Sequence, residues 1–423
     1  MIRFIVRFLM AGLVCLGCTE DIYAQYRVQL HPTGAVSQNQ LVQLLENEVQ
    51  FADGSKIAWE NLYRYGELRE RANRSWVVLR QGEVVVADQL ELRPDGLTIQ
   101  SLLWKPVIVS WQDVRAIIRN VPKVLSARDR LLESVFHYQA AGFVVFNDQT
   151  RLDASCSINE DGRIILSQTS LGKEFVIPFA SVKACIFNPF VRSDSTRATI
   201  GFSDGSFGPA DNVSCQGSEL VWNTSTGVIL KTAAPLFSLE DFNAWDHLEF
   251  LQPIRSNVVY LDEVESAQTV ALPFFEGELG NELFELTHVL PERDGKGRNV
   301  LGGWLRSNDS LALHGIGMSA LSRKTFKVPD DALLFVSDIA VDSRALRRGS
   351  VTFHVFLRSG AGEWRSVHSS RVLRGGDPSR TIQVELQGAT ELSLAVGMAD
   401  RATVADYANW LDARFVVDGD KLE

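Results

Sequence analysis

Aromatic side chains beside carboxylates and amides are the feature of this sequence best suited to binding a polyhydroxylated ligand. Trp304 follows Gly302-Gly303, and Trp364 lies in the segment Gly360-Ala-Gly-Glu-Trp364-Arg365. An indole face packs against the apolar C–H side of a sugar ring, while polar neighbours bind the hydroxyl groups. We therefore predict that Trp304 and Trp364 contact carbohydrate. For each, packing over the end of a β-sandwich is the alternative.

Trp410, Asp342 and Asp406 are further candidate ligand contacts. Trp410 precedes an apolar run, Phe415-Val-Val417, so a core position is the favoured alternative. The two aspartates, together with Asp412, have the chemistry to orient a ligand, hold a structural Ca²⁺ or cap turns. Ca²⁺ needs about six to eight oxygen ligands, and no EF-hand spacing is present. Turn capping is therefore favoured, and no cofactor is predicted.

Carboxylates also raise the question of glycoside hydrolysis, which needs two of them about 5–10 Å apart. Glu263, Glu265, Glu276 and Asp294 are available, but acidic residues are common throughout this chain. The sequence has no nucleophile elbow, metal-ligand triad or phosphate-binding glycine loop. We expect a protein that is not an enzyme, with an unrecognised hydrolase as the weakest alternative.

Length and charge restrict the remaining classes. The chain has 423 residues, of which 45% are hydrophobic and 22% charged, which is typical of a globular protein with about two to four folding units. The formal net charge is −10, and no run of lysines and arginines forms a basic patch. A nucleic-acid partner is therefore not expected.

The first 24 residues have the pattern of a secretory signal. Arg3 and Arg7 precede an uncharged apolar segment, residues 8–17, and Ile22-Tyr23-Ala24 offers a cleavage site before Gln25. The apolar segment is short for a membrane helix. We expect a secreted, periplasmic or cell-envelope protein with no membrane span in the mature chain. A lipid anchor at Cys18 is the alternative.

Three cysteines remain beyond this segment: Cys156, Cys185 and Cys215. They are too few for a disulfide scaffold, and no two have the spacing of a zinc knuckle. Free thiols, or at most one bridge, are expected.

A recurring motif predicts tandem β modules in the first half of the chain. A branched aliphatic residue stands two positions before an aromatic one in Ile57-Ala-Trp59, Val109-Ser-Trp111 and Ile177-Pro-Phe179. In two cases an apolar strand precedes the aromatic residue of this motif at nearly the same distance. The same spacing, counted forward from Phe202, places a fourth motif at residues 234–237. Asp-Gly turns and alternating apolar residues indicate short antiparallel strands. The predicted modules span residues 25–68, 75–120, 141–188 and 197–252, and they resemble small β-barrel-like repeats of bacterial envelope proteins.

One insertion interrupts the modules. Leu125, Leu132, Val135 and Phe136 recur at helical spacing within residues 121–140. This spacing predicts an amphipathic helix whose apolar face packs against a neighbouring module.

The region after Pro253 reads as a separate antiparallel sandwich, most simply a jelly roll, over residues 253–423. Val351, Phe353, Val355 and Leu357 alternate with other residues, as expected of a strand with one buried face.

Six short motifs follow in order within this region. They are Tyr260-Leu-Asp262, Gly315-Ile-Gly317 with Ser322, Val341-Asp342, Gly349-Ser-Val351-x-Phe353-x-Val355, Gly388-Ala-x-x-Leu392-x-Leu394 and Asp406-x-Ala-Asn-Trp410-x-Asp-Ala413. Together they resemble the NPCBM family of carbohydrate-binding modules over about residues 256–418. The resemblance implies a galactose-binding-like β-sandwich, non-catalytic and often attached to bacterial glycosidases. Ser319, Tyr407 and Ala340 depart from residues common in that family.

The leading hypothesis is a secreted, non-catalytic protein whose C-terminal sandwich binds a glycan or polysaccharide and is displayed on β repeats. A structural or protein-interaction role in the cell envelope, without sugar binding, is the first alternative. An accessory part of a glycoside hydrolase system is the second.

Overall fold

The computed structural model describes residues 26–45, 47–71, 74–136, 142–168, 172–191, 196–216, 218–233, 243–271, 297–400 and 403–418. Within these residues the chain is all-β, apart from the α-helix α3 (Leu125–Phe136) and short 3-10 turns. The predicted all-β class with one inserted helix is thus confirmed. The predicted signal segment lies outside the described residues.

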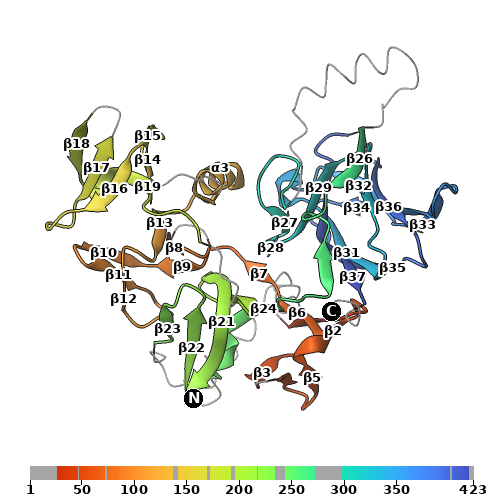
Figure 1. The fold of residues 1–423 in the computed structure, drawn as a ribbon, viewed down its shortest axis with the longest axis horizontal. Helices are drawn as coiled ribbons and strands as arrows, with labels where there is room; N and C mark the ends of the chain where they lie inside the picture. The colour runs from red at the N-terminus through yellow and green to blue at the C-terminus, as the bar shows by residue number, and fades with distance from the viewer. Residues whose placement is uncertain are drawn as a thin grey trace, which may run out of the picture.

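A 14-stranded antiparallel sheet joins residues 26–253, here called the repeat region (Figure 1). In each of four units the first strand pairs with the last, and each pair contains a register shift. The four pairs are β1 (Arg27–Leu30) with β6 (Leu62–Gly66), β8 (Ser75–Leu79) with β13 (Val114–Ile118), β14 (Phe143–Phe146) with β19 (Val182–Ile186), and β20 (Ala198–Phe202) with β24 (Leu248–Pro253). We call them units 1 to 4 in chain order.

Shorter strands lie between the first and last strand of each unit. They are β2 (Val36–Gln38), β3 (Leu41–Leu44), β4 (Glu48–Phe51), β5 (Lys56–Ala58), β9 (Val84–Ala87), β10 (Gln89–Arg93), β11 (Gly96–Gln100), β12 (Val107–Val109), β15 (Arg151–Asp153), β16 (Ser155–Ile158), β17 (Ile164–Gln168), β18 (Lys173–Ile177), β21 (Phe207–Gln216), β22 (Glu219–Thr224) and β23 (Ile229–Lys231). Three units close with a 3-10 turn before the last strand: η1 (Trp59–Asn61), η2 (Phe179–Ser181) and η3 (Ala244–His247). The closing turn of unit 4 is therefore η3, whereas the predicted step at residues 234–237 lies outside the described residues.

The units do not follow one another in space. Strand β13 pairs with β19, β9 with β21, and β24 with β6, so the spatial order is unit 3, unit 2, unit 4, unit 1. Helix α3 buries Leu131, Leu132 and Val135 against the face of the sheet that carries Trp76. Figure 1 shows this helix between the repeat units and the C-terminal region.

Two antiparallel sheets make up the C-terminal region, which we call the sandwich. The first sheet contains β25 (Val258–Tyr260), β29 (Gly315–Ser319), β31 (Ala332–Val341), β35 (Arg380–Glu385) and β37 (Tyr407–Val417). The second contains β26 (Ser266–Ala271), β30 (Ser322–Lys327), β32 (Ser350–Arg358), β33 (Arg365–Ser369), β34 (Leu373–Arg374) and β36 (Glu391–Met398). The core lies between the sheets, and the alternating residues of β32 from Val351 to Leu357 point into it as predicted.

The sandwich is paired directly with the repeat region. The hairpin β27 (Leu305–Ser307) and β28 (Ser310–Ala312) takes a strand of the repeat region, β7 (Leu68–Arg69), as its third strand. Nearby, the turn at Gly34 lies on β31: a Cβ atom at this residue, whose φ is +68°, would be 2.8 Å from Val336 Cγ1. This packing leaves no room for a side chain at Gly34 and covers part of the first sheet.

Candidate functional site

Trp410 lies in the core of the sandwich. Its side chain, on β37, is 0% exposed, and its ring meets that of Phe353 edge-on at a centroid distance of 5.0 Å. This is the core position that the sequence favoured for Trp410, and it places the indole away from solvent.

Asp342 is buried where β31 ends. Its Oδ1 accepts a hydrogen bond from the backbone N–H of Arg344 at 2.9 Å, which caps the 3-10 turn η4 (Ser343–Ala345). Its Oδ2 accepts from Asn409 Nδ2 at 2.7 Å and from Asn299 Nδ2 at 3.3 Å. Burial raises the pKa of Asp342 despite these bonds. The carboxylate therefore connects the turn η4, strand β37 and the loop that carries Asn299.

Asp406 has a comparable position just before β37. Its Oδ1 accepts from the backbone N–H of Ser350 at 2.7 Å, and its side chain is almost fully buried. Burial, reinforced by the nearby charge of Asp400, raises its pKa to about 6. Asp342 thus caps a turn, which is the role the sequence favoured, whereas Asp406 binds the first residue of the distant strand β32.

Trp304 packs against the repeat region. Its ring lies 6.4 Å from that of Trp76, 5.4 Å from that of Phe136 and 6.1 Å from that of Phe207, measured between centroids. These partners come from β8, α3 and β21, so the indole fills the space between the two halves of the chain. Part of its surface remains exposed.

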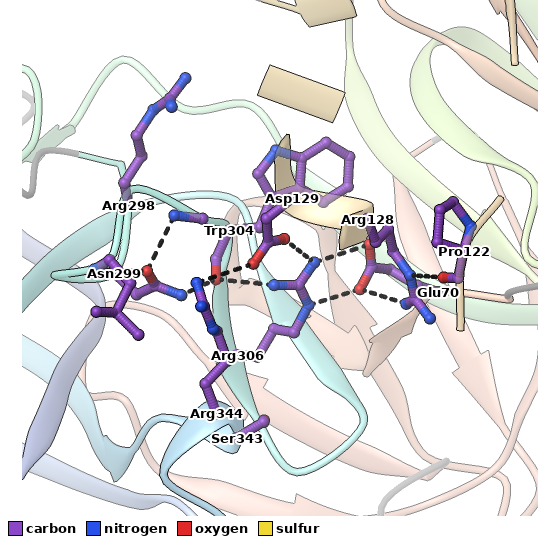
Figure 2. A network of polar contacts seen from close by, with 12 residues as sticks. Glu70, Pro122, Arg128, Asp129, Arg298, Asn299, Trp304, Arg306, Ser343 and Arg344 are labelled. Atoms are coloured by element: carbon purple, nitrogen blue, oxygen red, sulfur yellow. Dashed lines mark hydrogen bonds and ion pairs between the residues drawn. The ribbon is translucent and has the colours of Figure 1, made fainter. Parts of the chain in front are cut away.

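A buried ionic network lies beside Trp304 (Figure 2). Arg306 donates from Nε to Glu70 Oε2 at 2.6 Å, and its Nη2 lies 2.8 Å from Asp129 Oδ1. Glu70 also binds Arg128 at 3.1 Å, and Arg344 lies 3.7 Å from Asp129. Burial alone would lower the pKa of Arg306, but Glu70 and Asp129 outweigh it and raise that pKa. The charges compensate one another across the boundary between the halves.

A second buried network joins unit 1 to the first sheet of the sandwich. Arg64, on β6, donates to Asp338 Oδ2 at 2.7 Å and to Asp412 Oδ2 at 2.5 Å. Arg27, on β1, donates to both oxygens of Asp338 at 3.2 Å and to Thr381 Oγ1 at 2.8 Å. Burial would raise the pKa of Asp338, but the two arginines lower it overall. Asp412 belongs to the last of the six motifs that resemble the NPCBM family, and it is bound by Arg64 of the repeat region.

A cleft opens beside this second network. Its volume is about 950 Å³. One wall belongs to unit 1 and the other to the sandwich. Both contribute charged and apolar groups, and the hydroxyl groups come from the sandwich. A smaller cavity of about 440 Å³ adjoins it, since Arg69 and Asp309 line both.

Trp364 occupies a different surface. It precedes β33, and Figure 1 shows β33 at the end of the sandwich remote from the repeat region. The side chain is half-buried, and the Arg358 guanidinium lies 4.6 Å from the ring centroid. Arg358 pairs with Glu391, while Arg365 donates to Gln387 Oε1 at 3.2 Å. The indole thus carries one guanidinium on its ring, and that guanidinium is paired with a carboxylate. An aromatic face with polar groups nearby suits a sugar ring and its hydroxyls.

The remaining acidic residues and cysteines considered in the sequence do not form a metal site among the described residues. Among the described residues, no three metal-ligating side chains cluster, and no helix is long and apolar enough to cross a bilayer. Glu263 and Glu265 are exposed before β26, whereas Glu276 and Asp294 lie outside the described residues. Cys156, Cys185 and Cys215 form no disulfide bond with one another.

Sequence reasoning missed both ionic networks. Arg64, Glu70 and Arg306 carry no motif, and their partners are distant in sequence. A charged residue within an apolar strand, as at Arg64 in Leu-Tyr-Arg-Tyr-Gly, is the one signal that the sequence offered. It indicates a buried partner, although it does not identify which residue that is.

Comparison with known proteins agrees with the sequence resemblance. Residues 291–416 match the family model described as NPCBM/NEW2 domain. A protein of Renibacterium salmoninarum named "Putative endo-alpha-N-acetylgalactosaminidase" is 28% identical over 102 residues. That match covers 24% of this chain and 6% of the relative, so the chain spans a small part of its length.

Solved structures with limited similarity include several CBM51 modules. CBM51 from Clostridium perfringens GH95, in complex with methyl-galactose, is 21% identical and covers 37% of this chain and 99% of its own, with a TM-score of 0.29. The tandem CBM51 modules of the family 98 glycoside hydrolase from Streptococcus pneumoniae SP3-BS71 are 11% identical and cover 92% of this chain and 93% of their own, with a TM-score of 0.30. The motifs, the two-sheet architecture and the family match coincide on one stretch. Residues 291–416 of this chain are an NPCBM/NEW2 domain.

Proposed function

We propose that this chain is a non-catalytic carbohydrate-binding protein whose sandwich recognises a glycan through the Trp364 loop. The observation that carries the proposal is the NPCBM/NEW2 match over residues 291–416, the stretch that also contains Trp364. The repeat region then serves as the scaffold on which this domain is held. Export to the cell envelope or beyond, as the N-terminal segment suggests, is part of the same proposal.

Accessibility supports Trp364 over the other four predicted contacts. Trp410 is fully buried, and Trp304 packs on the repeat region. Asp342 caps a turn, and Asp406 is buried and bonded to the backbone of Ser350. Trp364 retains exposed surface and has Glu363, Arg365 and Gln387 beside it. A sugar ring stacked on the indole would have donors and acceptors for its hydroxyls within reach.

The test is a glycan array probed with the full chain. We expect retention of one or a few related glycans and its loss in Trp364→Ala. Phe175→Ala is the matched control, since Phe175 is an aromatic residue on β18 that is 42% exposed. The full chain is required because residues 253–423 alone would leave Arg306, Asp338 and Asp412 without their buried partners.

No retained glycan would favour the alternative of a structural or protein-interaction role. Retention that is unaffected by Trp364→Ala would place the glycan elsewhere on the molecule. Hydrolysis of chromogenic glycosides by the full chain would contradict the non-catalytic part of the proposal.

A further inference from the structure

We propose that the cleft between unit 1 and the sandwich is a second saccharide site, which takes a neutral oligosaccharide of more than one ring. It differs from the Trp364 site in position and in chemistry. The inference rests on the proposed function only for the class of ligand.

The size and walls of the cleft fit such a ligand. A volume of about 950 Å³ is at the upper end of the range typical of small-ligand sites, and such sites often lie between domains. Arg27 and Gln38 line it from unit 1, whereas Ser310, Ser379 and Thr381 line it from the sandwich. The site is therefore complete only when both halves are present.

The polar groups of the cleft are held in fixed positions. Arg64 and Asp338, which line it, are buried, and their side chains are 9% and 2% exposed. Arg27 donates to Ser379 Oγ at 3.3 Å and to Thr381 Oγ1 at 2.8 Å, which fixes both hydroxyl groups. A ligand that binds prearranged donors and acceptors loses little affinity to side-chain ordering.

The charge balance indicates a neutral ligand. Asp338 already binds Arg27 and Arg64, and Arg64 also binds Asp412. An anion would compete with these carboxylates for the guanidinium groups, and removing one partner of a buried pair is unfavourable. Sugar hydroxyls both donate and accept, so they can bind the outer edges of the pairs without separating them.

Apolar groups complete the match to a sugar. Val36, Leu311, Ala312, Pro378 and Leu411 line the same cleft as the hydroxyl and charged groups. A pyranose ring has an apolar face and a polar rim, and therefore needs both kinds of surface. Because the cleft is larger than one ring requires, oligosaccharides should bind more tightly than the corresponding monosaccharides.

The test uses isothermal titration calorimetry on the full chain with three neutral probes: cellotriose, N-acetylchitotriose and linear galactotriose. Val36→Trp should fill the mouth of the cleft, because Val36 lies on the edge strand β2 and is 46% exposed. We expect this variant to bind the preferred probe at least about tenfold more weakly, or about 1.4 kcal/mol. Ile229→Trp, at a 54% exposed position on β23, is the matched control and should bind like the wild type.

Trp364→Ala separates this site from the proposed one. A trisaccharide that still binds Trp364→Ala but not Val36→Trp supports the cleft, whatever becomes of the Trp364 site. If no neutral probe binds, or if Val36→Trp and Ile229→Trp bind equally, the cleft is not a saccharide site. Tighter binding of trigalacturonate than of any neutral probe would overturn the assignment of a neutral ligand.

Discussion

Arg306 of the sandwich and Glu70 of the repeat region form a bidentate pair. Nε donates to Oε2 at 2.6 Å and Nη2 to Oε1 at 3.1 Å, and the two side chains are only 2% and 5% exposed. Parallel hydrogen bonds of this kind are among the strongest that side chains form, and burial makes each charge dependent on the other. The NPCBM/NEW2 domain is therefore docked on the repeats through specific contacts and is not merely tethered to them.

Glu70→Gln should destabilise the protein, because it leaves the buried charge of Arg306 with less compensation. Losing one partner of a buried pair typically lowers the free energy of unfolding by about 3–5 kcal/mol. Urea denaturation measures this change in the free energy of unfolding. Glu391→Gln is the control, since it alters the more exposed pair with Arg358, which should contribute about 0–1 kcal/mol. If both variants lowered the free energy of unfolding equally, the buried pair of Arg306 and Glu70 would be no more stabilising than a surface pair.

Asp406 should make stability fall as pH rises. Its pKa is raised from 3.8 to about 6 in the folded chain. Below pH 4 the carboxyl is protonated in both states, and between pH 4 and 6 only the folded state retains the proton, so the free energy of unfolding decreases. Asp406→Asn removes this dependence. Relative to the wild type, this variant should therefore become progressively more stable as the pH rises from 4 to 7.

The pH series is measured by urea denaturation at pH 4, 5, 6 and 7. Asp400→Asn should weaken the pH dependence in part, since the charge of Asp400 helps to raise the pKa of Asp406. A constant difference between Asp406→Asn and wild type across this range would show that the carboxyl has an ordinary pKa.

Trp410→Ala should be among the most destabilising single substitutions in the sandwich. The ring fills the space beside Phe353 and Phe335, and a large aromatic residue replaced by alanine in a core costs about 3–5 kcal/mol. Chemical denaturation followed by far-ultraviolet circular dichroism measures the loss. A change below 1 kcal/mol would mean that Trp410 does not occupy the core.

Trp304→Ala should weaken the packing of the sandwich on the repeat region without abolishing glycan retention. Its ring contacts Trp76, Phe136 and Phe207, so its removal weakens the packing of β27–β28 on the repeat region. Hydrogen exchange of the amides that pair β7 with β28 should become faster, whereas exchange in β32 and β36 should not change. Loss of glycan binding with unchanged exchange would instead make Trp304 a ligand contact.

Local patterns in the sequence predicted the sandwich well. The alternation from Val351 to Leu357 reports burial on one face, and the position of Trp410 before an apolar strand indicated its place in the core. These features depend on neighbours in the sequence. The sequence also indicated repeats, because a similar short motif recurs before the last strand of units 1, 2 and 3.

The contacts between the repeat region and the sandwich could not be predicted from local patterns. The sequence makes Trp304 a candidate ligand contact because it is a loop aromatic with polar neighbours. Its ring partners Trp76 and Phe207 lie far away along the chain and approach it only in the fold. Arg64 and Asp338 likewise meet across distant strands. Trp364 differs because the residue stacked on its ring, Arg358, comes from the preceding strand of the same hairpin and is close in the sequence.

Glycan recognition through the Trp364 loop is tested most directly by the affinity of the full chain for its best-retained glycan. Calorimetry measures this affinity for wild type, Trp364→Ala and Phe175→Ala. Binding that is lost in Trp364→Ala and unchanged in Phe175→Ala, with equal thermal stability of all three proteins, is the predicted result. Equal affinity of Trp364→Ala and wild type for that glycan would contradict recognition through the Trp364 loop.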